Sequence, residues 1–64
     1  MKVRDVFRVL RDDGWYVART QGDHRVLKHA NKPGIVVLPG HPSDELAPGT
    51  LKSIWQQAQL EEWR

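Results

Sequence analysis

Three histidines are the side chains of this sequence best suited to chemistry near neutral pH: His24, His29 and His41. The imidazole pKa in model peptides is about 6.5, so a histidine can accept or donate a proton under ordinary conditions. Histidines also bind metals, but this spacing matches no zinc signature and the chain contains no cysteine. We therefore expect proton transfer without a metal or other cofactor, and the lack of cysteine excludes disulfide bonds.

Basic residues are concentrated in the first half of the chain. Residues 1–32 contain eight Lys or Arg against four Asp, a formal balance of +4, whereas residues 33–64 have a balance of −2. A basic half on a small domain favours an anionic partner such as nucleic acid, although an ordinary solvated surface gives the same count. The residues that could bind a phosphate backbone are Lys2, Arg4, Arg8, Arg11, Arg19, Arg25 and Lys28. These groups could equally contact an acidic protein surface.

An amphipathic helix is predicted to begin near residue 2 and to end before Gly14. Its apolar positions have the spacing i, i+3, i+4, i+7 and are Val3, Val6, Phe7 and Leu10. Three of the basic residues repeat with similar spacing on a neighbouring face: Arg4, Arg8 and Arg11. Gly14 suits the position after the helix, where a left-handed backbone costs a glycine little. No strong N-cap residue precedes the helix, so its start is not sharply defined.

Three short strands are predicted next, at residues 15–21, 24–29 and 35–38, because these runs are rich in aromatic and β-branched residues. Gly22-Asp23 and residues 30–34 are turn signals between them. Short connections of this kind produce an antiparallel meander. The third run has no polar residue, which predicts burial on both faces or a central place in the sheet.

The second strand carries both apolar and charged residues on each of its faces. Alternation puts His24, Val26 and Lys28 on one face, so Val26 and Leu27 cannot both be buried under the same helices. The opposite face carries Arg25, Leu27 and His29. Lys28 is then the nearest cation on the face of His24, where it could hold a phosphate or remain solvated.

A second helix is predicted near residues 48–59, after an irregular segment. Its apolar positions are Leu51, Ile54, Trp55 and Ala58. Pro48 suits its first turn, and Thr50 is a competing N-cap. The tail from Leu60 to Arg64 continues this helix or frays. The element order is α-β-β-β-α, which predicts one α+β domain over residues 1–64, with two helices on one face of a three-stranded antiparallel sheet.

Four aromatic residues have two possible uses, in the core or against nucleic-acid bases. They are Trp15, Tyr16, Trp55 and Trp63. In so small a core, Trp15 and Trp55 are expected to be packing residues. Trp63, near the end of the chain, would be a lid on the core or an exposed contact for a partner.

Several short motifs occur together in an order that matches a known family. They are Gly14-Trp15, Arg19, Gly22-Asp23-His24, residues 36–41 (VVLPGH), Glu45-Leu46, Gly49-Thr50-Leu51 and Ser53-Ile54. From Lys2 to Leu60 the chain resembles the HicA (YcfA-like) mRNA interferase toxins. The resemblance implies a fold similar to a double-stranded RNA-binding domain. It also implies ribonuclease activity on translated mRNA and neutralisation by a HicB-type antitoxin.

The catalytic histidine of the family corresponds to His24. RNA carries its own nucleophile, the 2′-OH, so the enzyme has only to move protons and stabilise charge on the phosphate. His24 is therefore a hypothetical general acid or base in a metal-independent transesterification or hydrolysis. Gly22 would let the backbone turn sharply and leave room for a phosphate. Asp23 stands where the family usually has serine, and it would favour the imidazolium form of a neighbouring histidine.

The sequence is compatible with two other functions. One is an RNA-binding module of the same fold without catalysis, and the other is a protein-interaction domain. No apolar run approaches the roughly 20 residues of a membrane span, and charged residues interrupt any signal-peptide core near the N-terminus. We therefore expect a cytoplasmic protein without a membrane partner. The short chain predicts a thin margin of stability and a free form that is a monomer or weak dimer.

Overall fold

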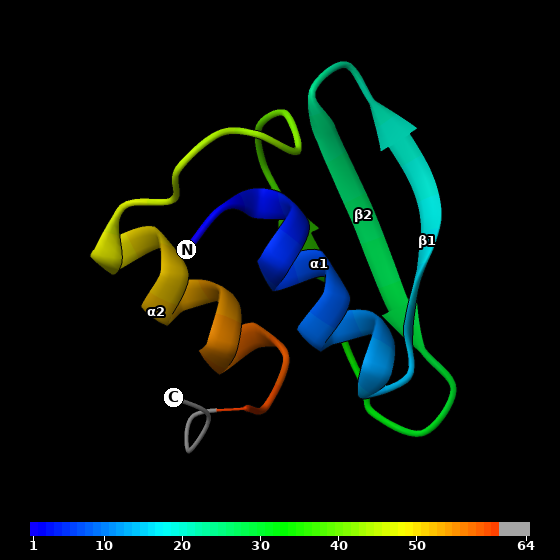
Figure 1. Cartoon of the computed structure of the whole chain (residues 1–64). Coiled ribbons are helices and arrows are strands. Elements are labelled where there is room, and N and C mark those ends of the chain that lie inside the picture. The colour runs from blue at the N-terminus through cyan, green and yellow to red at the C-terminus, as the bar shows by residue number, and fades with distance from the viewer. Residues whose placement is uncertain (61–64) are drawn as a thin grey trace.

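The structure is a computed structural model that describes residues 1–60. Its elements in chain order are α1 (Val3–Asp12), β1 (Trp15–Gln21), β2 (His24–His29), β3 (Val36–Leu38) and α2 (Pro48–Gln57). Both helices cover the same face of an antiparallel sheet, and the opposite face is left open (Figure 1). The predicted α+β order and the two-layer arrangement are confirmed.

The strand order is β1-β2-β3, so β2 is central and β3 lies at an edge. The prediction that the third strand is central or buried on both faces was therefore wrong. Val36 and Leu38 are buried under the helices, whereas Val37 is only partly covered and Ile35, outside the strand, is 45% exposed. The apolar run arises because Val37 and Ile35 contribute to the open face, and not because the strand is enclosed.

The central strand buries one residue on each side of the sheet. Leu27 is fully buried and belongs to the core beneath the helices. Val26 is 7% exposed but lies on the open face, where it is paired with Arg19 on β1 and Val37 on β3. The mixed pattern of β2 is thus explained, because neighbouring residues of a strand point to opposite faces.

The core beneath the helices receives side chains from all five elements. Its largest fully buried residue is Trp15, and Trp55 is also buried, so the expectation that these two tryptophans are packing residues is confirmed. The buried members of the core are Val3, Val6, Leu10, Trp15, Leu27, Val36, Leu38, Ile54, Trp55 and Ala58. Most of the positions selected by helical spacing therefore point inward; Phe7 and Leu51 are partly buried at its border.

Backbone carbonyls cap the start of α1. The first N–H groups of a helix have no partner inside it, and Lys2 at the N-cap makes no side-chain hydrogen bond there. The N–H of Val3 donates to the carbonyl of Asp44 at 2.9 Å, and that of Arg4 donates to the carbonyl of Pro42 at 3.0 Å. This explains why the sequence contains no strong N-cap signal: the loop after β3 supplies the acceptors.

The second helix begins with Ala47 as N-cap and Pro48 in its first turn, so the Pro48 start is confirmed. Thr50 lies within the helix and is not its N-cap. The helix ends at Gln57, two residues earlier than predicted, because Gln59 adopts a left-handed backbone with φ of 58°. Leu60 follows the helix without continuing it, and the predictions for the rest of the tail, including Trp63, lie outside the described residues.

A polar junction around Asp13 joins the far ends of both helices to the loop between β2 and β3 (the Asp13 junction: Asp13, His29, Lys32 and Ala58). The Lys32 ammonium contacts the Asp13 carboxylate at 2.6 Å and donates to the carbonyl of Ala58 at 3.1 Å. His29 Nδ1 accepts backbone N–H groups of Asn31 and Lys32, so Nε2 carries the proton and donates to the carbonyl of Asp13 at 2.6 Å.

Replacing Gly14 with alanine should weaken the Asp13 junction. Gly14 has φ of 106°, and an added Cβ would lie 2.6 Å from His29 Nε2. The strained backbone and a displaced hydrogen bond should together cost about 2–3 kcal/mol, lowering the melting temperature by about 10 °C or more. Gly34→Ala is the matched control, because Gly34 also has positive φ (81°) but open space around it. Equal losses in the two variants, measured by thermal denaturation, would contradict this account of the junction.

Candidate active site on the open face of the sheet

His24 is the first residue of β2 and lies exposed at one end of the open face. The turn before it depends on Gly22, whose φ of 54° is a left-handed conformation. An added Cβ at Gly22 would meet nothing within 4 Å, so the space beside the turn is open. Opposite His24 on β1 is Gln21. The described residues make no hydrogen bond or ion pair with the imidazole, which leaves both ring nitrogens accessible to a ligand.

Two cations share the open face with His24. Lys28 lies four residues further along β2, on the same face by alternation, and Arg19 is paired with Val26 between them. Both line a depression of about 420 Å³, together with Ala18, Val26 and Ile35. Tyr16 is paired with Lys28 and is 52% exposed, so it keeps the predicted capacity to stack on a base.

A β-bulge turns Arg19 toward this face. Trp15 and Val17 are paired with His29 and Leu27 on the helix-covered face, and simple alternation would put Arg19 there too. The register shifts between Val17 and Arg19, which brings Arg19 opposite Val26 instead. Sequence reasoning missed this change, because no glycine or proline marks the bulge.

The remaining predicted cations lie on the other side of the sheet. The guanidinium of Arg25 is 5.7 Å from the centre of the Phe7 ring, so Arg25 packs against α1. Helical spacing puts the exposed arginines of α1 on the same flank as Phe7. This helix flank consists of Arg4, Arg8, Arg11 and Arg25. Lys2 is half-buried at the start of α1, where its backbone pairs with Glu45. The predicted binding residues thus form two groups.

The three histidines have three different environments. His29 belongs to the Asp13 junction and also makes an edge-on contact with Trp15, the ring centres being 5.2 Å apart. His41 lies in the loop after β3, where Nε2 is 3.6 Å from Oδ1 of Asp23. Among residues 1–60, no group of three or more His, Cys, Asp or Glu side chains is placed to hold a metal ion.

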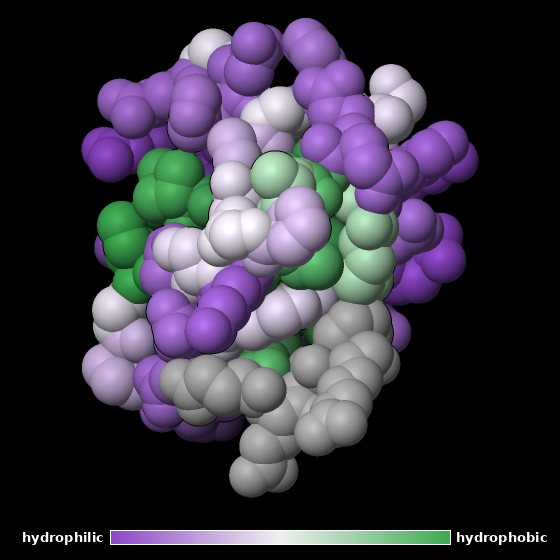
Figure 2. Space-filling view, turned by 90° about the vertical axis from the view of Figure 1, so that its left-hand side faces the viewer, coloured by the Kyte–Doolittle hydropathy of each residue, from purple (hydrophilic) through white to green (hydrophobic). Residues whose placement is uncertain are grey.

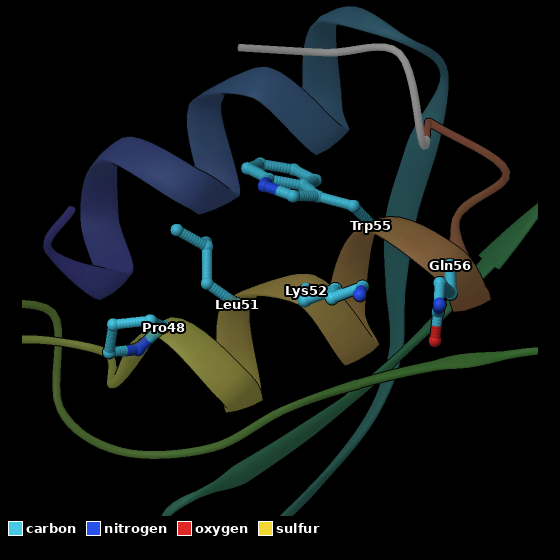
Figure 3. A pocket seen from close by; sticks show the side chains of 5 residues that line it. All are labelled: Pro48, Leu51, Lys52, Trp55 and Gln56. Carbon is cyan, nitrogen blue, oxygen red and sulfur yellow. The ribbon is translucent and has the colours of Figure 1, made fainter.

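A second hollow, of about 320 Å³, lies along α2 and has mainly apolar walls. Figure 3 shows Leu51 and Trp55 pointing from α2 toward α1, with Pro48, Lys52 and Gln56 completing the lining. On the side of the molecule drawn in Figure 2, hydrophobic residues reach the surface in patches between hydrophilic ones. Among the described residues that line this hollow, Lys52 is the one with a charged side chain, and none is a histidine or a carboxylate. We therefore locate the candidate active site on the open face.

The open face has the features of a site for an extended anionic chain. Its histidine is exposed, its two cations are spaced along the sheet, and both cations line a depression that is open to solvent. Such a surface suits a polymer with repeated phosphates better than a small molecule, which binds in an enclosed cavity. In the part of the chain that the structure describes, no helix is long and apolar enough to cross a membrane.

Comparison with known families gives one match over most of the chain. A family model described as HicA toxin of bacterial toxin–antitoxin matches residues 3–60. These bounds include both helices and all three strands. A comparison with curated proteins found no match.

The contrast between His29 and His24 can be tested by stability. His29→Ala removes three hydrogen bonds and the contact with Trp15, which should cost about 2–4 kcal/mol. His24→Ala should change the free energy of unfolding by less than about 0.5 kcal/mol, because the ring is exposed. Urea denaturation of both variants provides the measurement. A large loss in His24→Ala would show that this histidine has a structural role.

Proposed function

This chain belongs to the HicA toxin family of bacterial toxin–antitoxin systems, and we propose that it acts there as an endoribonuclease that cleaves mRNA, with His24 as general acid or base. The family match over residues 3–60 supports the class of activity. The observation that carries the site is the exposed His24 beside an open glycine turn, on the face that also presents Arg19 and Lys28.

The proposed reaction uses the substrate's own nucleophile. The 2′-oxygen attacks the adjacent phosphorus, the bond to the 5′-oxygen breaks, and His24 accepts or donates one of the two protons that move. Arg19 and Lys28 would hold the phosphates and reduce the negative charge that develops during attack. This mechanism requires no metal ion, because proton transfer and charge stabilisation both come from side chains.

The shape of the open face favours a single strand. A strand laid along β2 would pass His24, Arg19 and Lys28 in turn, and Tyr16 offers a surface for stacking an unpaired base. The helix flank lies on the other side of the sheet, so one short strand on the open face does not reach all of it. We propose that Arg4, Arg8, Arg11 and Arg25 contact either a further stretch of RNA or the antitoxin.

A toxin of this family requires a partner that neutralises it, and we propose a HicB-type antitoxin for that role. An antitoxin could act by covering the open face or by presenting acidic groups to the helix flank. A messenger-RNA substrate would place the protein in the cytoplasm. An alternative function is RNA binding without cleavage. It is supported by Asp23, which adds a negative charge beside His24 where a phosphate would approach.

Induced expression of the wild type should stop bacterial growth and degrade mRNA, and His24→Ala should relieve both effects. The purified wild type should cleave RNA in the presence of EDTA, and His24→Ala should reduce the rate by about 10²–10⁴-fold. Thermal denaturation of His24→Ala serves as the folding control. RNA binding without cleavage by the wild type would support the non-catalytic alternative, and undiminished cleavage by His24→Ala would remove this residue from the mechanism.

The two groups of cations can be separated by their effects on RNA binding. In the His24→Ala background, Arg19→Ala with Lys28→Ala should weaken binding of single-stranded RNA and flatten the slope of log K against log salt by about 1.4. Arg8→Ala with Arg11→Ala removes the same charge from the helix flank and should have a smaller effect. Filter binding at several salt concentrations gives both slopes. The opposite ranking would place the RNA on the helix flank.

A further inference from the structure

A second histidine stands at the same corner of the molecule as His24. The register pairs Arg25 of β2 with Leu38 of β3, so the chain that leaves β3 runs past the start of β2. Three residues later, Nε2 of His41 is 3.6 Å from Oδ1 of Asp23, the residue immediately before His24. The imidazole and the carboxylate are both exposed, at 69% and 63%, so neither is part of the core.

The loop that carries His41 is held in place by several hydrogen bonds. The backbone N–H of His41 donates to Oδ2 of Asp44 at 2.9 Å, and the carbonyl of His41 accepts the N–H of Asp44 at 2.9 Å. Pro42 and Asp44 in turn accept the first N–H groups of α1. Gly40 makes the sharp turn before His41 and has φ of 85°. A Cβ added at this position would lie 3.0 Å from Oδ2 of Asp44, so a larger residue would be crowded there. The backbone position of His41 is therefore determined by the hydrogen bonds of the loop and does not depend on the imidazole.

RNA cleavage through the 2′-oxygen needs two proton transfers at different places. One group removes the proton of the 2′-OH, and another donates a proton to the departing 5′-oxygen. His24 alone can perform one of these transfers at a time. The corner described above supplies a second imidazole, whose Nε2 is 3.6 Å from the carboxylate of the residue next to His24.

We propose that His41 is the general acid of this cleavage, that His24 is its general base, and that Asp23 is a positioning residue for His41. His24 takes the proton from the 2′-OH as the bond from the 2′-oxygen to phosphorus forms. His41 gives its proton to the 5′-oxygen as the bond to phosphorus breaks. The products are a 2′,3′-cyclic phosphate and a free 5′-OH, and the protein has gained one proton and lost one. This assignment rests on the proposed ribonuclease function.

The role of His41 as general acid follows from the negative charge of its neighbour Asp23. The contact of 3.6 Å between His41 Nε2 and Asp23 Oδ1 is an ion pair when the imidazole is protonated, and the protonated form is the one that a general acid uses. A charged His41 also offsets the carboxylate, so Asp23 need not repel the phosphate that approaches His24. The residue that replaces the family's usual serine thus has a use in this chain. It orients the acid and does not itself exchange protons with RNA.

The test compares two leaving groups at one linkage. An RNA oligonucleotide that the wild type cleaves is synthesised with its natural 5′-oxygen and, separately, with sulfur in place of that bridging oxygen. A thiolate is a far weaker base than an alkoxide and leaves without protonation, so the sulfur substrate bypasses the general acid. Cleavage rates are measured for the wild type, His24→Ala, His41→Ala, Asp23→Asn and Ser43→Ala. Ser43 lies exposed in the same loop and is the matched control.

His41→Ala should slow cleavage of natural RNA by about 10²–10³-fold and change cleavage of the sulfur substrate less than about 10-fold. His24→Ala should slow both substrates. Asp23→Asn should show the selectivity of His41→Ala in weaker form, slowing cleavage of natural RNA about 10-fold. In a double variant that combines Asp23→Asn with His41→Ala, it should add little to the effect of His41→Ala alone. Ser43→Ala should leave both rates unchanged.

Two results would overturn the assignment of His41 while leaving the ribonuclease proposal intact. One is natural RNA cleaved by His41→Ala at the wild-type rate, and the other is an equal loss on both substrates, which indicates a structural role. If the wild type cleaves no RNA from which such an oligonucleotide could be chosen, the ribonuclease proposal is overturned, and the role of His41 with it. The two failures are therefore distinguishable in one set of rates.

Discussion

The alternation of side chains along β2 is the constraint on which the rest of the structure depends. Leu27 must be buried beneath the helices, and this places both of its neighbours, Val26 and Lys28, on the open face. A slip of one residue in the pairing would carry His24 and Lys28 under the helices and expose Leu27. The candidate active site and the hydrophobic core are therefore determined by the same register.

Polar contacts at both ends of α1 secure that register. At one end, the Asp13 junction ties α1 and α2 to the loop after β2 through Lys32 and His29. At the other, carbonyls of the loop after β3 cap α1 and thereby hold His41 near Asp23. A chain of 64 residues has a small core, so these contacts contribute a larger share of its stability than they would in a larger domain. Stability and the placement of the proposed acid are supplied by the same loop.

Local signals in the sequence were sufficient for most of the fold. Gly14 and Gly22 mark the ends of neighbouring elements, so both long strands were predicted with their observed bounds. The edge position of β3 was not predictable in the same way, because its apolar residues serve two faces that only the tertiary structure defines. Arg19 depended on a bulge without a sequence signal. The approach of His41 to Asp23 joins residues 18 apart in the chain, and a motif can suggest such a contact but not its geometry.

The bulge in β1 has a consequence beyond the side chain that it redirects. β1 lies at the edge of the sheet, and within residues 1–60 no strand pairs with the outer side of its seven residues. Such an edge is a template on which another chain can add a strand and begin to aggregate. The extra residue interrupts the regular row of N–H and C=O groups and increases the local twist, and the charge of Arg19 stands beside the break. The irregularity that brings a cation to the open face thus also protects the molecule against self-association along this edge.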